Sequence, residues 1–532
     1  MSSPLPLGPS SALRSAKTVQ ARKDILNSYY EEGFHYSKSL IGHKSCVNAL
    51  AFSCGNGQYM ASAGDDLIVR LWDLHREDIK VASAFSGARG NIFSLAFSAS
   101  NKYLYSGGVD CKVFRYTLDE DGAGSDAVWT HHDEDVRAVT AHPYSDDVAL
   151  SCGEDGRVIL YDSRADFSRA QATLQLMSEV TCVQYNPRMD HVFVTSDAAG
   201  KVCLRDARMA FGPSSLRSQH GVVHTYATTL QKPSGAHAKP TVSSVVFDAD
   251  GKASPLLSLT WSYTHFYPTI YGMTDTGPLA ICTGKFFPDG NPPPDGERTY
   301  CNDATIKACL SHSSSPHVSP LQHGSFGGPD GTYYAAGSDD FRGYVWQIPP
   351  LRELQEQRQV LNEAEWRARE IGQVADSAQG DYKARYLPVQ LNRPEFQLRG
   401  HQSIVNTALA HPHLPLIATA GIESHIMLHS PTPGVPFSQE PLGLTRLDTR
   451  RLPHPSRADR DAIRRILIGI VPPTEDEDDF SDQTTINLFD EILRTEGGDD
   501  NDGVFDTGLS WMSDDSESDE IEDEGMMSVD EG

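Results

Sequence analysis

The same acid–base pair occurs twice in this 532-residue chain, each time at the end of an apolar run. Asp162 and Arg164 follow the run VILY, and Asp206 and Arg208 end the stretch KVCLRDAR, so the two arginines are 44 residues apart. A guanidinium at this spacing can make several directed hydrogen bonds to another protein. Because the pair recurs, we interpret it as a protein-binding element, and two local surface salt bridges are the alternative interpretation.

His43, Ser62 and Asp66 have the residue types of a hydrolase triad. The chain nevertheless contains no G-x-S-x-G, H-E-x-x-H or phosphate-binding G-x-x-x-x-G-K motif. Its nine cysteines are scattered singly, with no C-x-x-C pair that would indicate a zinc site. We therefore predict that the protein is not an enzyme in its own right and that it needs no cofactor or metal.

The formal net charge of −27 is concentrated in one part of the sequence. Residues 475–532 contain 23 acidic side chains and one basic side chain, which leaves a net charge of −5 for the other residues. A body without a basic stripe argues against direct binding to nucleic acid. Because no apolar run is long enough to span a membrane and the cysteines suit a reducing compartment, we expect a protein of the nucleus and cytoplasm.

Seven units with a similar pattern follow one another along the chain. Their strand-like apolar runs close at Trp72, Tyr116, Tyr161, Arg205, Tyr271, Trp346 and His429. The first four are 44, 45 and 44 residues apart, and a polar insertion at 209–240 precedes the fifth unit. Apolar runs separated by Gly, Asp, Asn or Ser are typical of short antiparallel strands with tight turns. A period of about 40–45 residues with four strands is the signature of a β-propeller blade.

The first unit closely resembles a WD repeat. It reads GHKSCVNALAFSCGNGQYMASAGDDLIVRLWD, opening with Gly42-His43 and closing with Trp72-Asp73. The resemblance implies an all-β fold, namely a seven-bladed WD-repeat β-propeller with disordered N-terminal and acidic C-terminal tails. It also implies that the ring closes by sharing one blade between the two ends of the repeat region, which we place at residues 39–435.

The same resemblance changes the interpretation of the triad-like residues. In WD repeats the positions of His43, Ser62, Asp66 and Trp72 form a buried hydrogen-bond network, and such a network is stable only when every polar group has a partner. The resemblance therefore implies a structural role instead of a catalytic one. Later units keep the pattern in part: the third has Ser151, Asp155 and Tyr161, and the fourth has Thr195, Ala199 and Arg205.

Outside the repeats we expect an N-terminal tail at 1–38, a helical insertion at 349–395 between blades six and seven, and an Arg-rich linker with an acidic disordered tail at 436–532. The stretch LRELQEQRQVLNEAEWRAREIG, bounded by prolines and a glycine, is strongly helix-forming and predicts a solvated helix over one rim of the ring. A dedicated binding helix is the alternative interpretation. The low apolar content and high charge of the tail predict disorder.

One apolar island, INLFDEILR, interrupts the acidic tail. Its residues Ile486, Phe489, Ile492 and Leu493 are at helical spacing. An amphipathic segment of this kind can be a docking helix that folds when it binds a partner. A stray hydrophobic cluster is the alternative interpretation.

The paired Asp-x-Arg boxes resemble those of the WD-repeat substrate receptors of cullin-4 ubiquitin ligases. The stretches KSLIGHKSCVNALAFS, YYAAGSDDFRGYVWQIP and LRGHQSIVNTALAHPH, together with LFDEIL and WMSDDSESD in the tail, are similar to the cullin-4-associated factors with acidic tails. The chain departs from the pattern at Arg205, where an aromatic residue is usual, and in the first unit, where Trp72-Asp73-Leu74-His75 lacks the arginine.

This resemblance implies that Asp162, Arg164, Asp206 and Arg208 bind the damage-specific DNA-binding adaptor protein, and through it cullin-4. A target protein, which the sequence does not identify, would then bind another surface of the propeller. The alternative function is a non-catalytic WD-repeat scaffold of a nuclear or cytoplasmic protein assembly, in which the Asp-x-Arg pairs are only structural.

Overall fold

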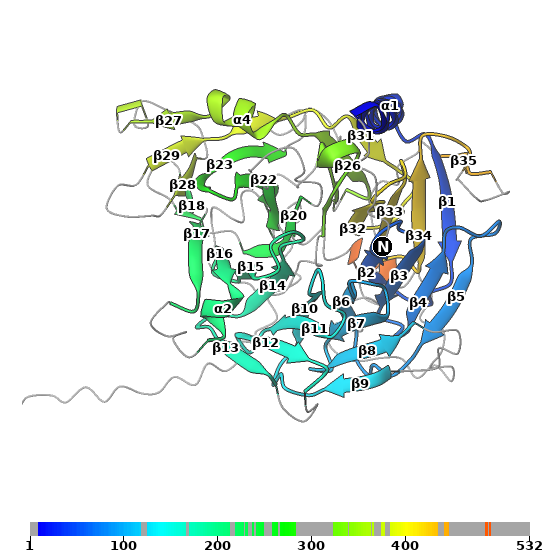
Figure 1. Cartoon of the computed structure of the whole chain (residues 1–532), viewed down its shortest axis with the longest axis horizontal. Coiled ribbons are helices and arrows are strands. Elements are labelled where there is room, and N and C mark those ends of the chain that lie inside the picture. Colours follow the sequence, from blue (N-terminus) through cyan, green and yellow to red (C-terminus); the bar gives the residue numbers. More distant parts are fainter. Residues whose placement is uncertain are drawn as a thin grey trace, which may run out of the picture.

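The computed structural model describes residues 485–487, 489 and 490 and residues 9–445, except 119–124, 166–169, 213–218, 228, 232–236, 239–240, 249–257, 264–265, 283–322, 339, 363, 366–373, 378–383 and 435–440. Seven blades built on four antiparallel strands surround a central axis (Figure 1). The predicted seven-bladed β-propeller is therefore confirmed. No helix in the described part of the chain is long and apolar enough to cross a membrane.

Blades one to four each consist of four consecutive strands. The strands of blades one and two are β2 (Val47–Phe52), β3 (Tyr59–Gly64), β4 (Val69–Asp73), β5 (Val81–Phe85), β6 (Ile92–Phe97), β7 (Tyr103–Gly108), β8 (Val113–Thr117) and β9 (Ser125–Trp129). The strands of blades three and four are β10 (Val136–Ala141), β11 (Val148–Gly153), β12 (Arg157–Asp162), β13 (Ala172–Gln175), β14 (Val180–Tyr185), β15 (Val192–Asp197), β16 (Lys201–Asp206) and β17 (Val222–Ala227).

Blades five to seven are less regular in sequence. Blade five has β20 (Val242–Phe247), β21 (Ser258–Tyr263), β22 (Phe266–Gly272), β23 (Asp275–Cys282) and an added parallel strand, β30 (Val389–Leu391). Blade six has β24 (Ser325–Gly327), β25 (Tyr333–Gly337), β26 (Gly343–Gln347) and β31 (Phe396–Leu398). Blade seven has β32 (Val405–Ala410), β33 (Ile417–Gly421), β34 (His425–Ser430), β1 (Tyr36–Ile41) and the short β35 (Gly443–Leu444). All seven predicted unit ends lie in the third strand of a blade.

Antiparallel strands give the ring two distinct faces. Because each strand reverses the direction of the previous one, the turns after the first and third strands of every blade emerge on one face. We call this the box face, since Arg164 and Arg208 follow the third strands of blades three and four. The turns after the second and fourth strands emerge on the opposite face, which we call the tail face.

A bulge at the start of each inner strand recurs around the ring. The pairing of first and second strands shifts between Val47 and Ala49 in blade one, and at the equivalent position in blades two, three, four, five and seven. The backbone there approaches the end of the second strand so closely that a Cβ on Gly64 would lie 1.9 Å from the carbonyl oxygen of Cys46. A Cβ does not fit this approach in blade one. The second strands of blades two, three, six and seven also end in glycine, whereas those of blades four and five end in Asp197 and Tyr263.

The ring is closed by a strand from the other end of the repeat region. Strand β1 pairs with β34 over six residues, with Leu40 opposite Ile426. Leu40 is 2% exposed and packs in a core that also contains Trp72 of blade one and Leu428 of blade seven. The closure that the WD-repeat resemblance implied is therefore confirmed.

The segment before the ring differs from the predicted N-terminal tail. Helix α1 (Pro9–Glu32) precedes β1, and its last turn is anchored on blade six. Tyr30 is fully buried and stacks on Tyr333 with ring centroids 4.5 Å apart, while Lys23 pairs with Asp330 at 2.6 Å. The composition of this segment is polar, so its order depends on a few tertiary contacts that a composition-based prediction does not register.

The insertion at 349–395 also differs from its prediction in position and in structure. It lies inside blade six, between β26 and β31, and its helix α4 covers only Leu351–Gln357. The chain then forms β27 (Gln359–Leu361), β28 (Val374–Ser377) and β29 (Ala384–Leu387), which join β18 (Thr229–Gln231) and β19 (His237–Ala238) in a side sheet.

The helix ends at Arg358 because tertiary contacts hold that residue in an extended conformation. Its guanidinium lies 2.8 Å from Asp275 and 4.4 Å from the ring of Tyr386, and it donates to the carbonyl of Gly277 at 3.1 Å. Contacts of this kind override the helix propensity of the local sequence.

Replacing Leu40 with Ala should loosen the closing strand, whereas replacing its neighbour Ile41, which is 81% exposed, should not. Removing a buried leucine costs about 2–4 kcal/mol of unfolding free energy, and an exposed site changes by about 0.5 kcal/mol or less. Urea midpoints of Leu40→Ala and Ile41→Ala, measured beside the parent protein, test this. Equal midpoints for the two variants would show that β1 does not close the ring.

Candidate protein-binding site

The two Asp-x-Arg boxes stand at equivalent places in neighbouring blades. Asp162 is the last residue of β12 and Asp206 is the last residue of β16. In each case the chain turns immediately after the aspartate, and the arginine two residues later emerges on the box face. In blade four this turn is the short helix α2 (Ala207–Ala210), which Asp206 caps through the backbone N–H of Arg208.

The internal geometry of the two boxes is nearly identical. The Arg164 Nε and NH2 groups donate to the two carboxylate oxygens of Asp162 at 2.9 and 2.7 Å. The corresponding distances from Arg208 to Asp206 are 3.0 and 2.6 Å. In both boxes the arginine backbone N–H also donates to the same aspartate at 3.0 Å. The aspartate therefore holds each guanidinium in one orientation by a two-point contact.

The arginine side chains stay exposed although they are oriented. The exposed fraction is 65% for Arg164 and 69% for Arg208, against 20% and 12% for their aspartates. Hydrogen bonds from the two arginines lower the pKa of Asp162 and of Asp206, so both carboxylates are charged at neutral pH. An exposed pair of this kind contributes little to folding stability, because both groups are well solvated.

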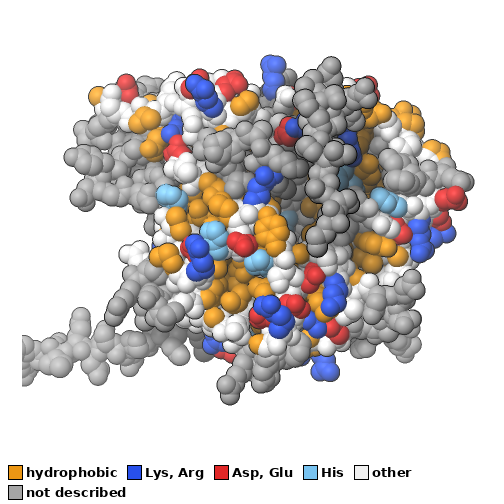
Figure 2. Space-filling model, viewed as in Figure 1, with side chains coloured by type: hydrophobic (Ala, Val, Ile, Leu, Met, Phe, Trp, Pro, Cys, Tyr) orange, Lys and Arg blue, Asp and Glu red, His pale blue; other side chains and the backbone are white. Residues whose placement is uncertain are grey.

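Three exposed apolar side chains, which the sequence analysis did not identify, accompany the boxes on the box face. Tyr144, in the turn after β10, is 64% exposed, and its hydroxyl donates to the carbonyl of Arg188 in blade four at 3.2 Å. Met209 follows Arg208 directly and is 47% exposed, and Val223 at the start of β17 is 49% exposed. The available sequence signal was an aromatic residue, Tyr144, in the polar turn that precedes the first box. Figure 2 shows basic, acidic and apolar side chains interspersed over one view of the ring.

Blade one lacks the box, as its sequence indicated. Asp73 accepts a hydrogen bond from the backbone N–H of His75 at 3.0 Å, and Arg76, three residues after Asp73, approaches it at 3.3 Å. Arg76 is 64% exposed, which is close to the value for Arg164. Its different spacing makes Arg76 a natural control for the two box arginines.

Blade four accommodates Arg205 in place of an aromatic residue. The side chain is buried, and its Nε donates to the Thr195 hydroxyl at 3.0 Å while NH1 donates to the His220 carbonyl at 2.9 Å. Burial lowers the pKa of Arg205 from its usual value. These bonds replace those that Trp72 makes in blade one, so the departure in sequence does not disturb the strand that carries Asp206.

The triad-like residues of blade one form a buried network, as the WD-repeat resemblance implied. The Trp72 indole donates to Ser62 Oγ at 2.8 Å, Ser62 lies 2.7 Å from His43 Nε2, and His43 Nδ1 lies 3.0 Å from Asp66. An indole N–H can only donate and a carboxylate can only accept. Trp72 therefore donates its hydrogen bond to Ser62, Ser62 donates to His43, and His43 donates to Asp66. Ser62 is fully buried, so this arrangement is structural.

Blades three and seven contain related networks. In blade three, His132 contacts Ser151 at 2.7 Å and Asp155 at 2.9 Å, and Ser151 bonds Tyr161 at 3.1 Å. The sequence analysis identified Ser151, Asp155 and Tyr161 but missed His132, because His131-His132 replaces the usual Gly-His dipeptide.

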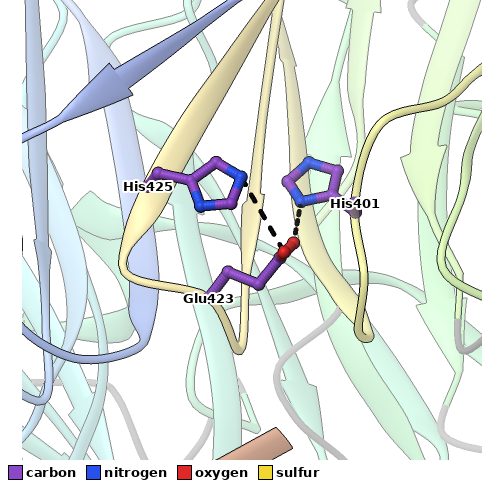
Figure 3. A group of neighbouring side chains, drawn as sticks. All are labelled: His401, Glu423 and His425. Atoms are coloured by element: carbon purple, nitrogen blue, oxygen red, sulfur yellow. Dashed lines mark hydrogen bonds and ion pairs between the residues drawn. The ribbon is translucent and has the colours of Figure 1, made fainter. Parts of the chain in front are cut away.

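In blade seven, His401 is hydrogen-bonded on both sides of its ring. Its Nδ1 lies 2.7 Å from Glu423 and its Nε2 lies 2.7 Å from Thr419, which is 2.8 Å from His429. His401, Glu423 and His425 have the residue types of a metal-binding group (Figure 3), and His425 lies 3.8 Å from Glu423. A metal would have to replace the bond between His401 and Glu423, so the arrangement fits a hydrogen-bond network better than a metal site.

The apolar island of the acidic tail lies on the propeller itself. Residues Thr485–Asn487 and Phe489–Asp490 are helical. Ile486 is 6% exposed, and Phe489 packs against a cluster of four buried residues. Those residues, Cys46, Phe341, Ile404 and Ile422, lie in turns of the tail face and form what we call the tail-face cluster. Ile492 and Leu493, also predicted for the docking helix, lie outside the described residues.

Comparison with known proteins agrees with this architecture. Residues 34–73, 79–116 and 125–162 match the family described as WD domain, G-beta repeat. The human DDB1- and CUL4-associated factor 5 is 28% identical over 400 residues, which cover 74% of this chain and 34% of the relative. The human DDB1- and CUL4-associated factor 6 is 24% identical over 239 residues, covering 42% of this chain and 27% of the relative.

A third relative is of a different kind. The Methylosome protein WDR77 of Xenopus laevis is 27% identical over 198 residues, which cover 35% of this chain and 57% of the relative. The chain spans about a third of the length of DDB1- and CUL4-associated factor 5, so the similarity concerns only part of that protein.

The blade-seven network should make the stability of the ring sensitive to acid. Burial lowers the pKa of His429 to about 3, and its Nδ1 has no hydrogen-bond partner among the described residues. In the unfolded chain the same group titrates near about 6.5, so between these values only the unfolded state takes up the proton. Unfolding free energy should therefore fall with pH below about 6.5, by up to about 1.4 kcal/mol per pH unit from this residue.

The variant His429→Gln keeps a side-chain amide for Thr419 but cannot titrate. Its unfolding midpoint should fall less steeply than that of the parent between pH 6.5 and pH 4, even if its stability at pH 7.5 is lower. Denaturation series at several pH values measure both slopes. Parallel slopes would mean that His429 does not contribute to the acid sensitivity.

Proposed function

We propose that this chain, a seven-bladed WD-repeat propeller that resembles the DDB1- and CUL4-associated factors, is the substrate-recognition subunit of a cullin-4 RING ubiquitin ligase. The observation that carries the proposal is the pair of equivalent boxes in blades three and four, each with an exposed arginine oriented by its own aspartate. The names of two relatives, which associate them with DDB1 and CUL4, support it.

Each box arginine is preorganised for binding by its own aspartate. An arginine that binds a partner normally loses side-chain freedom, and each immobilised long side chain costs about 0.5–1.5 kcal/mol. In both boxes the bidentate contact with the aspartate has already fixed the guanidinium in the free protein. The exposed apolar side chains of Tyr144, Met209 and Val223 next to the boxes supply the hydrophobic surface on which such polar anchors are usually set.

In this function the propeller performs no chemistry. The box face would bind the damage-specific DNA-binding adaptor protein, and the adaptor would bring cullin-4 and the ubiquitin-transfer machinery. Another surface of the ring would hold the target protein. We propose that the protein acts in the nucleus and cytoplasm.

A second candidate function is a scaffold without a link to a ligase. The similarity to the Methylosome protein WDR77 supports it, as does the fact that each box is complete as a local salt bridge. In a scaffold the two arginines would only close the turns after β12 and β16. The two functions therefore differ in what the exposed arginines bind.

Replacing both Arg164 and Arg208 with Ala should abolish binding of the adaptor and leave the fold intact. Losing two directed anchors at a desolvated interface weakens binding by a factor on the order of a thousand. The measurement is co-purification with the adaptor, followed by titration of the purified proteins. Thermal melting should be unchanged to within about 2 °C, because both side chains are exposed.

Arg76→Ala is the matched control, since Arg76 has a similar exposure and also pairs with the aspartate that ends a third strand, but with a different spacing. It should bind the adaptor as the parent does. If the double variant binds the adaptor as tightly as Arg76→Ala, or if the parent does not bind it, the ligase proposal is wrong and the scaffold function is favoured.

A further inference from the structure

The tail-face cluster combines residues from three blades. Cys46 precedes β2, Phe341 lies in the turn between β25 and β26, Ile404 precedes β32 and Ile422 follows β33. Their exposed fractions are 3%, 3%, 1% and 2% in that order. Apolar side chains at the ends of strands are normally partly exposed to solvent. The low exposure of these four therefore indicates that this part of the tail face is covered.

The segment 485–490 of the acidic tail packs on this cluster. Phe489 contacts the cluster, Ile486 is 6% exposed and Asp490 is 1% exposed. Figure 1 draws the segment in orange-red close to the centre of the ring, beside β2 and β32. Asn487, between the two apolar residues, is exposed. One helical face of the segment is therefore buried against the ring, and Asn487 lies on the solvent-exposed face.

Charge alone does not explain why the tail binds here. The turns of the tail face carry acids, among them Asp65, Asp110, Asp135 and Glu154, and bases, among them Lys44, Arg342 and Arg399, while the tail is strongly acidic. Because charges of both signs are present, the contact depends on packing Ile486 and Phe489 against the ring. Asp490 is buried beside these apolar groups, so a ligand that fits the site in the same way has an acid at this position.

We propose that the tail-face cluster is a helix-binding site, which residues 485–490 occupy in cis and for which target proteins compete in trans. The matching ligand is a short amphipathic helix with an aliphatic residue, two further residues, an aromatic residue and then an acid. The part of this proposal that concerns targets rests on the proposed function, because the adaptor would occupy the box face and leave the tail face for the target.

The length of chain between ring and segment makes such competition feasible. The last described residue of the ring is Thr445, and the segment begins at Thr485. A segment that is covalently joined to the protein that carries its site has an effective concentration of about a millimolar there, which masks the site from weak ligands but not from tight ones. A target must therefore bind more tightly than the tail or present more than one contact.

The test uses a fluorescein-labelled peptide with the sequence of residues 481–496 and the full-length protein. In fluorescence anisotropy, the parent protein should bind the peptide at least tenfold more weakly than the variant Ile486→Asp/Phe489→Asp, whose own segment no longer occupies the site. Met177→Asp changes a fully exposed side chain in a tail-face turn of blade three, outside the cluster, so it should behave as the parent does. The melting temperatures of the three proteins show whether the ring is intact.

Two peptide controls define the ligand. We call Ile486→Asp/Phe489→Asp the open variant. A peptide that carries the same two Asp substitutions should show no saturable binding to the open variant. A peptide with Asp490→Asn should bind the open variant several-fold more weakly than the native peptide does. Equal binding of the native peptide by parent and open variant, or equal binding of native and doubly substituted peptides, would overturn the proposal. No adaptor is present in this assay, so its outcome is independent of the test of the two box arginines.

Discussion

The hydrogen bond between a buried histidine ring and a buried hydroxyl is the interaction on which the tail face of this propeller depends. His43 and Ser62 make it in blade one, and His401 and Thr419 make it in blade seven. Each histidine lies in the turn before a first strand, while each hydroxyl lies on the second strand. The bond therefore fixes a tail-face turn to the interior of its blade, and the low polarity around it makes breaking the bond costly.

These networks also position the tail-face cluster. Cys46 lies three residues after His43, Ile404 lies three residues after His401, and Ile422 directly precedes Glu423. A rigid network under each turn keeps three of the four cluster residues in place without any ligand. The box face has no such support, and there the orientation of Arg164 and Arg208 comes from their own aspartates. The two faces thus obtain preorganised binding groups by different physical means.

Features that repeat along the chain could be predicted from the sequence, whereas contacts between residues far apart in the chain could not. Seven strand ends, the buried network of blade one and the two boxes each have a local pattern, so they were found. The cluster joins Cys46, Phe341 and Phe489, whose contact no periodicity reveals. Similarly, the order of α1 depends on Tyr30 stacking on Tyr333, and the early end of α4 depends on Arg358 pairing with Asp275. Tertiary contacts of this kind override composition and propensity.

The contact between the apolar island and the ring gives the acidic tail a physical role to explain. Acids and bases share the turns of the tail face, so the segment is bound through the packing of Ile486 and Phe489 and the burial of Asp490. A site that is occupied, but not tightly, excludes ligands that match it poorly and still yields to a helix that fits better. In the competition that we propose, the strength of the cis contact would set the threshold for target binding, and the cluster would set the selectivity.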